Sequence, residues 1–234
     1  MPSIAIVAAL EREVRPLVKK WRVQNREHDG RRLRFFQNDE TVLVCGGIGA
    51  SAARRATEAV IALFDPKLVY SAGFAGALDP TLKVSDILRP AQVINAGDAS
   101  STNLEGGTGI LVSFGSVASP EQKAKLRHSF GAKAVDMEAA SVARAAEARG
   151  VAFDVVKAIS DETDFEFPAM DRFVDSEGRF SESRFAMYAA IRPWLWPRVI
   201  QIARNSGRAS RALCAYLDKL TSTSAAVVAK LETE

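Results

Sequence analysis

The sequence predicts an α/β fold, a three-layer α/β/α sandwich built on a mixed, largely parallel sheet. Apolar runs of strand length alternate with helical segments along most of the chain, which is typical of a sheet covered on both faces. With 234 residues, 47% of them hydrophobic, the chain can bury a substantial core without disulfides or a metal. We expect a single domain over residues 1–234, with a basic helical C-terminal extension from about residue 191.

The order of the elements follows from hydrophobic periodicity and from turn residues. We expect strands over residues 3–9, 32–36, 41–45, 67–72, 84–88, 110–114 and 151–159, with the second and third joined as a hairpin. We expect helices over residues 11–20, 51–64 and 137–149. The glycine-rich segment from Asn95 to Gly109 is expected to be a loop and a candidate flap.

Three acidic residues occur where predicted strands end or predicted helices begin. They are Glu13 in LEREV, Glu138 in VDMEAAS and Asp161 in KAISDETD. In an open α/β sheet, ligands bind in the crevice outside the carboxyl ends of the strands, so residues from distant stretches can meet there. We take these three carboxylates as the centre of a candidate active site.

The charge, cysteine and histidine content exclude several classes of protein. The formal charge of +3 comes from 31 basic and 28 acidic residues, too balanced for a nucleic-acid binder. Cys45 and Cys214 lack CxxC spacing and are expected to be reduced thiols, which fits a cytoplasmic location. No apolar stretch is long enough to cross a bilayer, and the first residues lack the basic lead of a secretion signal. His28 and His128 have no ligand-spaced companions, so we expect neither a metal nor a cofactor.

Two segments near the C-terminus depart from the alternating pattern. Residues 165–185 carry five phenylalanines among acidic residues, and we expect this segment to cover the crevice. Residues 191–217 contain five arginines and no acid, together with Trp194 and Trp196. This basic stretch is either a solvated arginine face over packed tryptophans or a surface that contacts an anionic membrane.

Four motifs in order carry a resemblance to a known family: IAIVAALEREV, GGIGASAA, SAGFAGAL with VSDIL, and VDMEAASVA through VVKAISDETD. They resemble the purine nucleosidase and nucleoside phosphorylase superfamily, and within it the 5′-methylthioadenosine/S-adenosylhomocysteine nucleosidases. The C-terminal stretches FVDSEGRF through RPWLWP and ARNSGRASRALC are similar to the hopanoid-biosynthesis branch, whose members remove adenine from adenosylhopane. The resemblance implies the sandwich fold predicted above and a homodimer.

The resemblance implies a hydrolase that cleaves the N-glycosidic bond of a 5′-modified adenine nucleoside and releases adenine. Cleavage builds positive charge on the sugar and negative charge on the departing base. Asp161, kept protonated by burial and oriented by Ser160, would protonate purine N7. Glu13 would deprotonate the attacking water, and Glu138 would bind two ribose hydroxyls beside the cationic sugar.

Further residues are assigned to the pocket by the same resemblance. Met137 would pack under the ribose. The positions that would line the sugar and base pockets are Ile48, Phe74, Gly76, Val117 and Ala118.

Some positions depart from the family pattern. Where phosphorylases hold phosphate with an arginine and a serine, this chain has Ser71 and Phe74, so we expect water as the nucleophile. GGIG around Ile48 stays open as an anion site, because its glycines can present backbone N–H groups. Val117 stands where the nucleosidases stack adenine on a phenylalanine, which favours a bulkier 5′ group than methylthio. A phosphorylase and a non-catalytic nucleoside-binding or lipid-binding relative remain alternatives.

Five of the ten site residues also have a plain structural interpretation. Glu13 and Glu138 are typical of exposed carboxylates at helix starts, which the helix dipole favours. Asp161 is typical of a helix N-cap. Phe74 and Met137 would be ordinary core residues in many such settings.

Overall fold

The computed structural model describes residues 2–167, 170–175, 177–178 and 180–231. Within these residues eleven strands form one sheet, in the order β2-β3-β4-β1-β5-β10-β9-β7-β8, while β11 pairs with β5 and β6. The strands are β1 (Ile4–Ala8), β2 (Arg22–His28), β3 (Arg31–Asn38), β4 (Thr41–Cys45), β5 (Leu68–Ala77), β6 (Ile87–Leu88), β7 (Gln92–Asn95), β8 (Ser101–Asn103), β9 (Ile110–Ser113), β10 (Ala134–Asp136) and β11 (Ala152–Asp161). The helices are α1 (Glu11–Val18), α2 (Ala50–Phe64), α3 (Pro120–Phe130), α4 (Ala139–Glu147), α5 (Glu182–Ala190) and α6 (Trp196–Leu231), with 3₁₀ turns at η1 (Met170–Phe173) and η2 (Pro193–Leu195).

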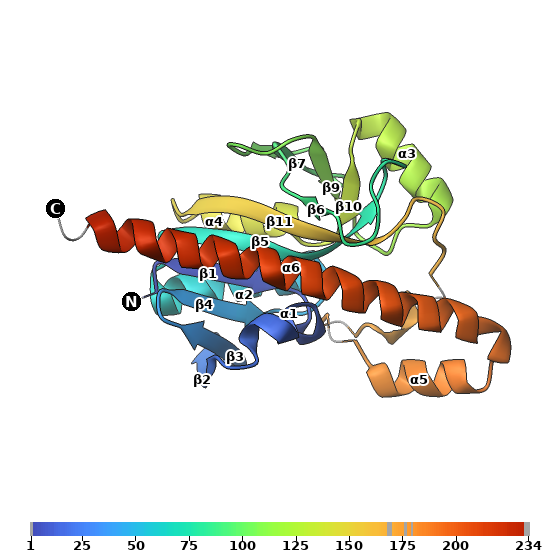
Figure 1. Ribbon diagram of the computed structural model, residues 1–234, viewed down its shortest axis with the longest axis horizontal. Coiled ribbons are helices and arrows are strands. Elements are labelled where there is room, and N and C mark those ends of the chain that lie inside the picture. Colours follow the sequence, from blue (N-terminus) through green and yellow to red (C-terminus); the bar gives the residue numbers. More distant parts are fainter. Residues whose placement is uncertain (1, 168–169, 176, 179, 232–234) are drawn as a thin grey trace.

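Helices cover both faces of the sheet, which confirms the predicted three-layer arrangement (Figure 1). On one face, α1 and the long helix α6 pack over β1, β5 and β11. On the other face, α2 and α4 pack over the same strands. Because successive side chains of a strand point to opposite faces, Ile6 joins the first core and Val7 the second.

The centre of the sheet is parallel and its margins are antiparallel. Strand β1 pairs in parallel with β4 and β5, and β5 pairs in parallel with β11. The predicted hairpin is confirmed as β3 and β4, and the unpredicted strand β2 extends it. The carboxyl ends of β1, β5 and β11 therefore meet at one edge, where the motifs of Glu13 and Asp161 lie. The motif of Glu138 follows β10, which runs antiparallel to the last residues of β5.

Strand β5 is longer than predicted, because it continues through Gly73-Phe74-Ala75-Gly76 to Ala77. Its last residues pair antiparallel with β10, while its neighbour β11 stays parallel to it. The pairing of β11 shifts register between Ile159 and Asp161, which makes Ser160 the extra residue of a bulge. The pairing of β5 and β11 is thus irregular at the end of both strands, next to Asp161.

The loop expected from Asn95 to Gly109 is interrupted, since residues 101–103 form β8 and pair antiparallel with β7, and its role as a flap stays a prediction. The strand predicted over residues 84–88 is reduced to β6. Helix α3 was not predicted, although Ser119 and Gln122 form a capping box and Pro120 occupies its first turn. Those three residues are a start signal that the sequence carries openly.

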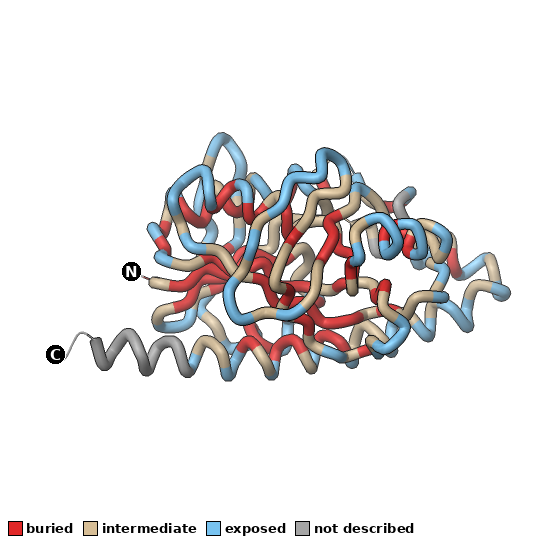
Figure 2. Tube along the Cα trace, turned by 90° about the horizontal axis from the view of Figure 1, so that it is seen from above, coloured by how far each residue is buried: buried red, intermediate tan, exposed pale blue. Residues whose placement is uncertain are grey.

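The C-terminal helix contributes to the core. Ala209, Leu213, Cys214 and Leu217 of α6 are buried, at the spacing of one helical face. Up to residue 222, where burial is described, the rest of the helix surface is mostly exposed or half-buried (Figure 2). The basic extension expected from about residue 191 thus includes a helix that packs on the sheet, and the single-domain organisation stays a prediction. Among the described helices, none has the length and apolar character needed to span a membrane.

Substituting Leu213 with alanine tests the contribution of α6 to stability. Leu213 is fully buried against the sheet, so Leu213→Ala should lower the free energy of unfolding by about 2–5 kcal/mol, measured by urea denaturation. Arg211→Ala, an exposed neighbour on the same helix, is the control and should change it by less than about 0.5 kcal/mol. Equal stability of the two variants would show that α6 is dispensable for the core.

Candidate active site

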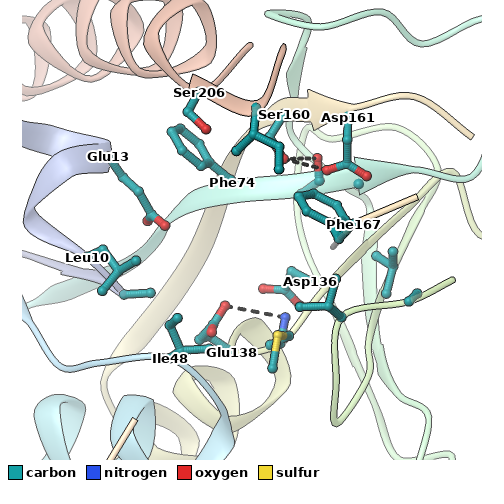
Figure 3. A pocket seen from close by; sticks show the side chains of 18 of the residues that line it. Leu10, Glu13, Ile48, Phe74, Asp136, Glu138, Ser160, Asp161, Phe167 and Ser206 are labelled. Atoms are coloured by element: carbon teal, nitrogen blue, oxygen red, sulfur yellow. Dashed lines mark hydrogen bonds between the residues drawn. The ribbon is translucent and has the colours of Figure 1, made fainter. Parts of the chain in front are cut away.

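The structure brings all ten predicted site residues to one pocket. Figure 3 labels Glu13, Ile48, Phe74, Glu138, Ser160 and Asp161 among them. They arrive from the start of α1, the loop after β4, the end of β5, the segment before α3, the start of α4 and the end of β11. Phe165, Phe167 and Phe180 also line it, so the aromatic segment does cover the crevice; its residues 168–169, 176 and 179 lie outside the described residues. Residues 202, 205 and 206 of α6 complete the wall.

Glu13 lies in the first turn of α1 and is buried, with 6% of its surface exposed. The interpretation as an exposed helix-start carboxylate is therefore wrong. Burial raises the pKa of Glu13 to about 7, the negative charge of Glu138 adds to the rise, and Lys157 and Arg12 oppose it. Oε2 of Glu13 accepts no hydrogen bond from any described residue. A pKa near neutral pH and a carboxylate oxygen without a hydrogen-bond partner among the described residues suit a general base.

Two contacts from the rest of the chain hold Glu13 in place. Helix α6 fastens the start of α1, since Ser210 Oγ donates to Arg12 O at 3.3 Å and Cys214 Sγ to Glu13 O at 3.6 Å. Under the carboxylate lies Gly73, where an added Cβ would stand 2.8 Å from Glu13 Oε2. Gly73 therefore leaves the space that the carboxylate occupies.

Glu138 stands at the N-terminus of α4 with its carboxylate on the pocket side. Its Oε1 accepts from the backbone N–H of Gly49 at 2.8 Å, and Oε2 from that of Met137 at 3.3 Å. Shielding from water raises the pKa of Glu138 to about 7, and the charge of Asp136 adds to the rise. The helix-start interpretation does not describe it, because Asp136 accepts the Ala139 N–H at 2.8 Å and Glu138 makes no capping bond.

Asp161 ends β11 and no helix begins there, so its interpretation as an N-cap is wrong. Ser160 Oγ donates to Asp161 Oδ1 at 2.6 Å, the orienting bond expected from the sequence. Gly76 passes so close that an added Cβ would stand 2.8 Å from Asp161 Oδ2. The same oxygen also accepts from Lys123 Nζ at 2.5 Å. Asp161 is thus buried beside a cation, whereas the sequence suggested burial alone.

Two buried lysines were missed by the sequence analysis. Lys157 Nζ lies 2.8 Å from Asp136 Oδ2, with both side chains almost fully inaccessible. Burial lowers the pKa of Lys157, but the charges of Asp136, Glu138 and Glu13 outweigh it and the pKa rises overall. A lysine inside the apolar strand VVKAIS was a signal for Lys157. Lys123 lies among other charged residues of α3 and carried no such signal.

The GGIG loop is already occupied by hydrogen bonds within the chain. Gly46 N donates to Ala8 O, Gly47 N to Ala9 O and Ile48 N to Gly178 O. Gly49 N donates to Glu138 Oε1. These four N–H groups are used, so the loop does not present the anion cradle that its glycines suggested. Among the residues that the structure describes, no three metal-ligating side chains gather at one point.

The apolar members of the site keep some surface open to the pocket. Phe74 and Met137 are only partly buried, so they are not plain core residues, although Phe74 also packs against the core on the α1 and α6 side. Ile48 and Val117 are likewise partly buried, while Ala118 is buried. In Figure 3 Phe74 lies between Glu13 and the Ser160–Asp161 pair. An apolar surface thus separates two groups of polar atoms.

Comparison with known proteins identifies relatives of this arrangement. Residues 3–109 and 107–190 match the sequence model of the phosphorylase superfamily. The 5′-methylthioadenosine/S-adenosylhomocysteine nucleosidase of Staphylococcus epidermidis is 32% identical over 197 residues, covering 68% of this chain and 86% of that protein.

Two solved structures of nucleosidases are also similar to this chain. The corresponding nucleosidase of Colwellia psychrerythraea, in complex with adenine, has a TM-score of 0.59 at 27% identity and covers 68% of this chain and 82% of its own. That of Helicobacter pylori, in complex with a substituted pyrrolidinol that carries a pyrrolopyrimidine, has a TM-score of 0.71 at 19% identity and covers 94% of this chain and 97% of its own. The second likeness bears out the fold over nearly the whole chain.

The raised pKa of Glu13 predicts a pH-dependent stability. Between pH 4.5 and about 7 the folded state binds more protons than the unfolded state, so the free energy of unfolding should fall as the pH rises through this window. Glu13→Gln should reduce the fall between pH 5 and pH 8 by on the order of 2–3 kcal/mol, measured by urea denaturation. Glu11→Gln, a partly exposed acid of the same helix that pairs with Arg34, should leave the fall unchanged. An equal fall in the wild type and in Glu13→Gln would contradict the raised pKa.

Proposed function

Because the chain belongs to the phosphorylase superfamily and folds three carboxylates into one pocket, we propose that it is a purine nucleosidase that hydrolyses the N-glycosidic bond of a 5′-modified adenine nucleoside. One observation carries the proposal. Glu13 and Glu138 point into the pocket from one side and Asp161 lies across it (Figure 3). Hydrolysis of a ribose–purine bond needs this separation, because the sugar and the base develop opposite charges.

The two glutamates serve the sugar. Glu13 takes a proton from the attacking water, and its pKa of about 7 allows it to be ionised beforehand and protonated afterwards. Glu138, held by the N–H groups of Gly49 and Met137, binds the ribose hydroxyls and places negative charge beside the cationic sugar. Asp161, oriented by Ser160, delivers a proton to N7 of the leaving purine.

Water is the nucleophile that these residues favour. Phe74 stands on the pocket wall where phosphorylases place a phosphate-binding side chain, and an aromatic ring donates no hydrogen bond to an anion. The N–H groups of Gly46 to Gly49 are bonded to oxygens of the chain itself. Because of both features, neither Phe74 nor the GGIG loop offers a hydrogen-bond donor to a phosphate in this pocket.

The pocket lining suits a substrate whose 5′ substituent is apolar. Phe165, Phe167, Phe180 and Ile202 line the pocket together with Val117, which replaces a larger ring. Methylthioadenosine, S-adenosylhomocysteine and an adenosylhopane-like lipid are the candidate substrates, and the aromatic lining favours the bulkier, more apolar groups.

A release assay tests the reaction. Purified protein should release adenine from at least one of adenosine, methylthioadenosine, S-adenosylhomocysteine and a 5′-alkylated adenosine, without added phosphate. Asp161→Asn and Glu13→Gln should each lose about 10²–10⁴-fold in kcat while keeping the wild-type circular dichroism spectrum. Asp164→Asn, exposed and close in sequence, is the matched control.

Strict dependence of adenine release on phosphate would assign a phosphorylase instead. Binding of these nucleosides with no release over a long incubation would assign a non-catalytic relative. Full turnover by Asp161→Asn or Glu13→Gln would remove that residue from its role.

We also propose that this cytoplasmic enzyme rests on an anionic membrane through the stretch around η2. Of the large hydrophobic residues found exposed in the described chain, five lie together here: Met187, Ile191, Trp194, Trp196 and Ile200. Arginines follow them on α6, and the outer wall of the pocket, at residues 202–206, is part of the same helix. Exposed tryptophans with neighbouring arginines suit the interface of a bilayer with acidic lipid.

Vesicle flotation tests the membrane contact. The protein should float with vesicles containing phosphatidylserine and not with phosphatidylcholine alone, and Trp194→Ala with Trp196→Ala should lower the bound fraction at least tenfold. Val23→Ala, an exposed apolar residue of β2, is the control. Absence of binding to both vesicles would end the proposal.

The homodimer implied by the resemblance is measured by light scattering on the same protein preparations. A dimer that the tryptophan variant abolishes would assign this surface to a second copy instead.

A further inference from the structure

A buried lysine touches the acid of the site. Lys123 Nζ lies 2.5 Å from Asp161 Oδ2 and 2.6 Å from the carbonyl oxygen of Glu162. Its side chain is 3% exposed and that of Asp161 5%, and both residues line the pocket. The ion pair therefore belongs to the site and is shielded from solvent.

The position of Lys123 is not one that local energetics favours. It is the fourth residue of α3, in the first turn, where the helix dipole disfavours a cation. Burying its long side chain also costs conformational entropy and hydration. The capping box of Ser119 and Gln122 fixes this turn, and with it the origin of the lysine side chain. The chain thus holds an ammonium group against Asp161 at a local cost.

The proposed function asks Asp161 to give a proton, which an ionised carboxylate lacks. A lysine ammonium hydrogen-bonded to Oδ2 can supply that proton, by transferring one of its three protons to the carboxylate as N7 takes one from Asp161. Ser160 donates to the other oxygen, so the carboxylate is fixed between two donors. If the ammonium only stabilised the ionised form of Asp161 and passed it no proton, Asp161 would have no proton to donate to the base.

Resting on the proposed nucleosidase reaction, we propose that Lys123 is the positioning residue and proton source of Asp161. One proton passes from Lys123 Nζ to the carboxylate of Asp161 and from there to N7 of the purine. The bonding pair of the C1′–N9 bond leaves with the base, while the water oxygen bonds to C1′ and its proton passes to Glu13. Lys123 ends as a neutral amine and Glu13 as a neutral acid, and both return to their starting forms by exchange with water.

Two substitutions of Lys123 test the proton supply. Lys123→Met keeps much of the side-chain volume and removes the proton, so kcat for adenine release should fall about 10²-fold or more. Lys123→Arg keeps the positive charge but does not give up a proton at any working pH, so it should not restore kcat. Lys125→Met, an exposed lysine on the same helix, is the matched control and should keep wild-type kinetics.

A substrate whose leaving group needs no proton separates this role from a structural one. On a 4-nitrophenyl riboside, the loss caused by Lys123→Met should be at least tenfold smaller than its loss on the adenine nucleoside. Asp161→Asn combined with Lys123→Met should be no slower than the slower single variant, since the two residues act as a unit. This double variant also removes both buried charges, so it reports on the mechanism even where Lys123→Met is unstable.

Each outcome is decisive. Recovery of adenine release by Lys123→Arg, or equal losses on both kinds of substrate, would overturn the proton supply. Wild-type kcat in Lys123→Met would overturn the role altogether while leaving the nucleosidase intact. Failure of the wild type to release adenine from any nucleoside would instead overturn the proposed function.

Discussion

The rest of the site depends on one buried positive charge, the ammonium of Lys157, which offsets the negative charges of the buried carboxylates around it. Its Nζ is paired at 2.8 Å with Asp136 Oδ2 and lies close enough to Glu13 and Glu138 to oppose the rise in the pKa of each. Without it, burying those acids near one another would force them to be neutral. Asp136 in turn accepts from Ser113 Oγ and from the N-terminus of α4. The same pair therefore orients the helix that carries Glu138.

The site is assembled from both ends of the chain. Helix α6, from the last third of the sequence, bonds the carbonyl groups of Arg12 and Glu13 and also lines the pocket. Arg12 stacks over the Phe180 ring at 5.2 Å, which joins the aromatic segment to α1. The proposed base is therefore held by the packing of α6 and of the aromatic segment as well as by its own helix. Stability of the C-terminal helix and geometry of the acid–base pair are coupled.

Much of this could be predicted from the sequence, for physical reasons. Buried strands such as β1 and the helix α2 are marked by uninterrupted or periodic apolar residues. Glu13 and Asp161 could be placed together because the parallel strands β1 and β11 end at the same edge, whereas Glu138 follows β10, which runs antiparallel to β5. The continuation of β5 through its glycines could not be predicted, since glycine weakens a strand and only the close approach of Glu13 and Asp161 requires it there. The apolar run VVKAIS marks Lys157 as a buried lysine, but its pairing with Asp136 depends on a tertiary contact that no local pattern records. The pairing of Lys123 with Asp161 depends on another such contact, between α3 and β11.

The bulge at Ser160 decides where the acid points. In a regular strand two consecutive side chains face opposite sides of the sheet, yet Ser160 and Asp161 both line the pocket and are bonded to each other. A homologue with the same letters in a regularly paired strand, without the bulge, would have its serine and aspartate side chains on opposite faces of the sheet. Such a protein would match the motif and lack the chemistry. The letters ISD therefore do not by themselves carry the chemistry, because the bulge at Ser160 is also needed to bring both side chains to the pocket.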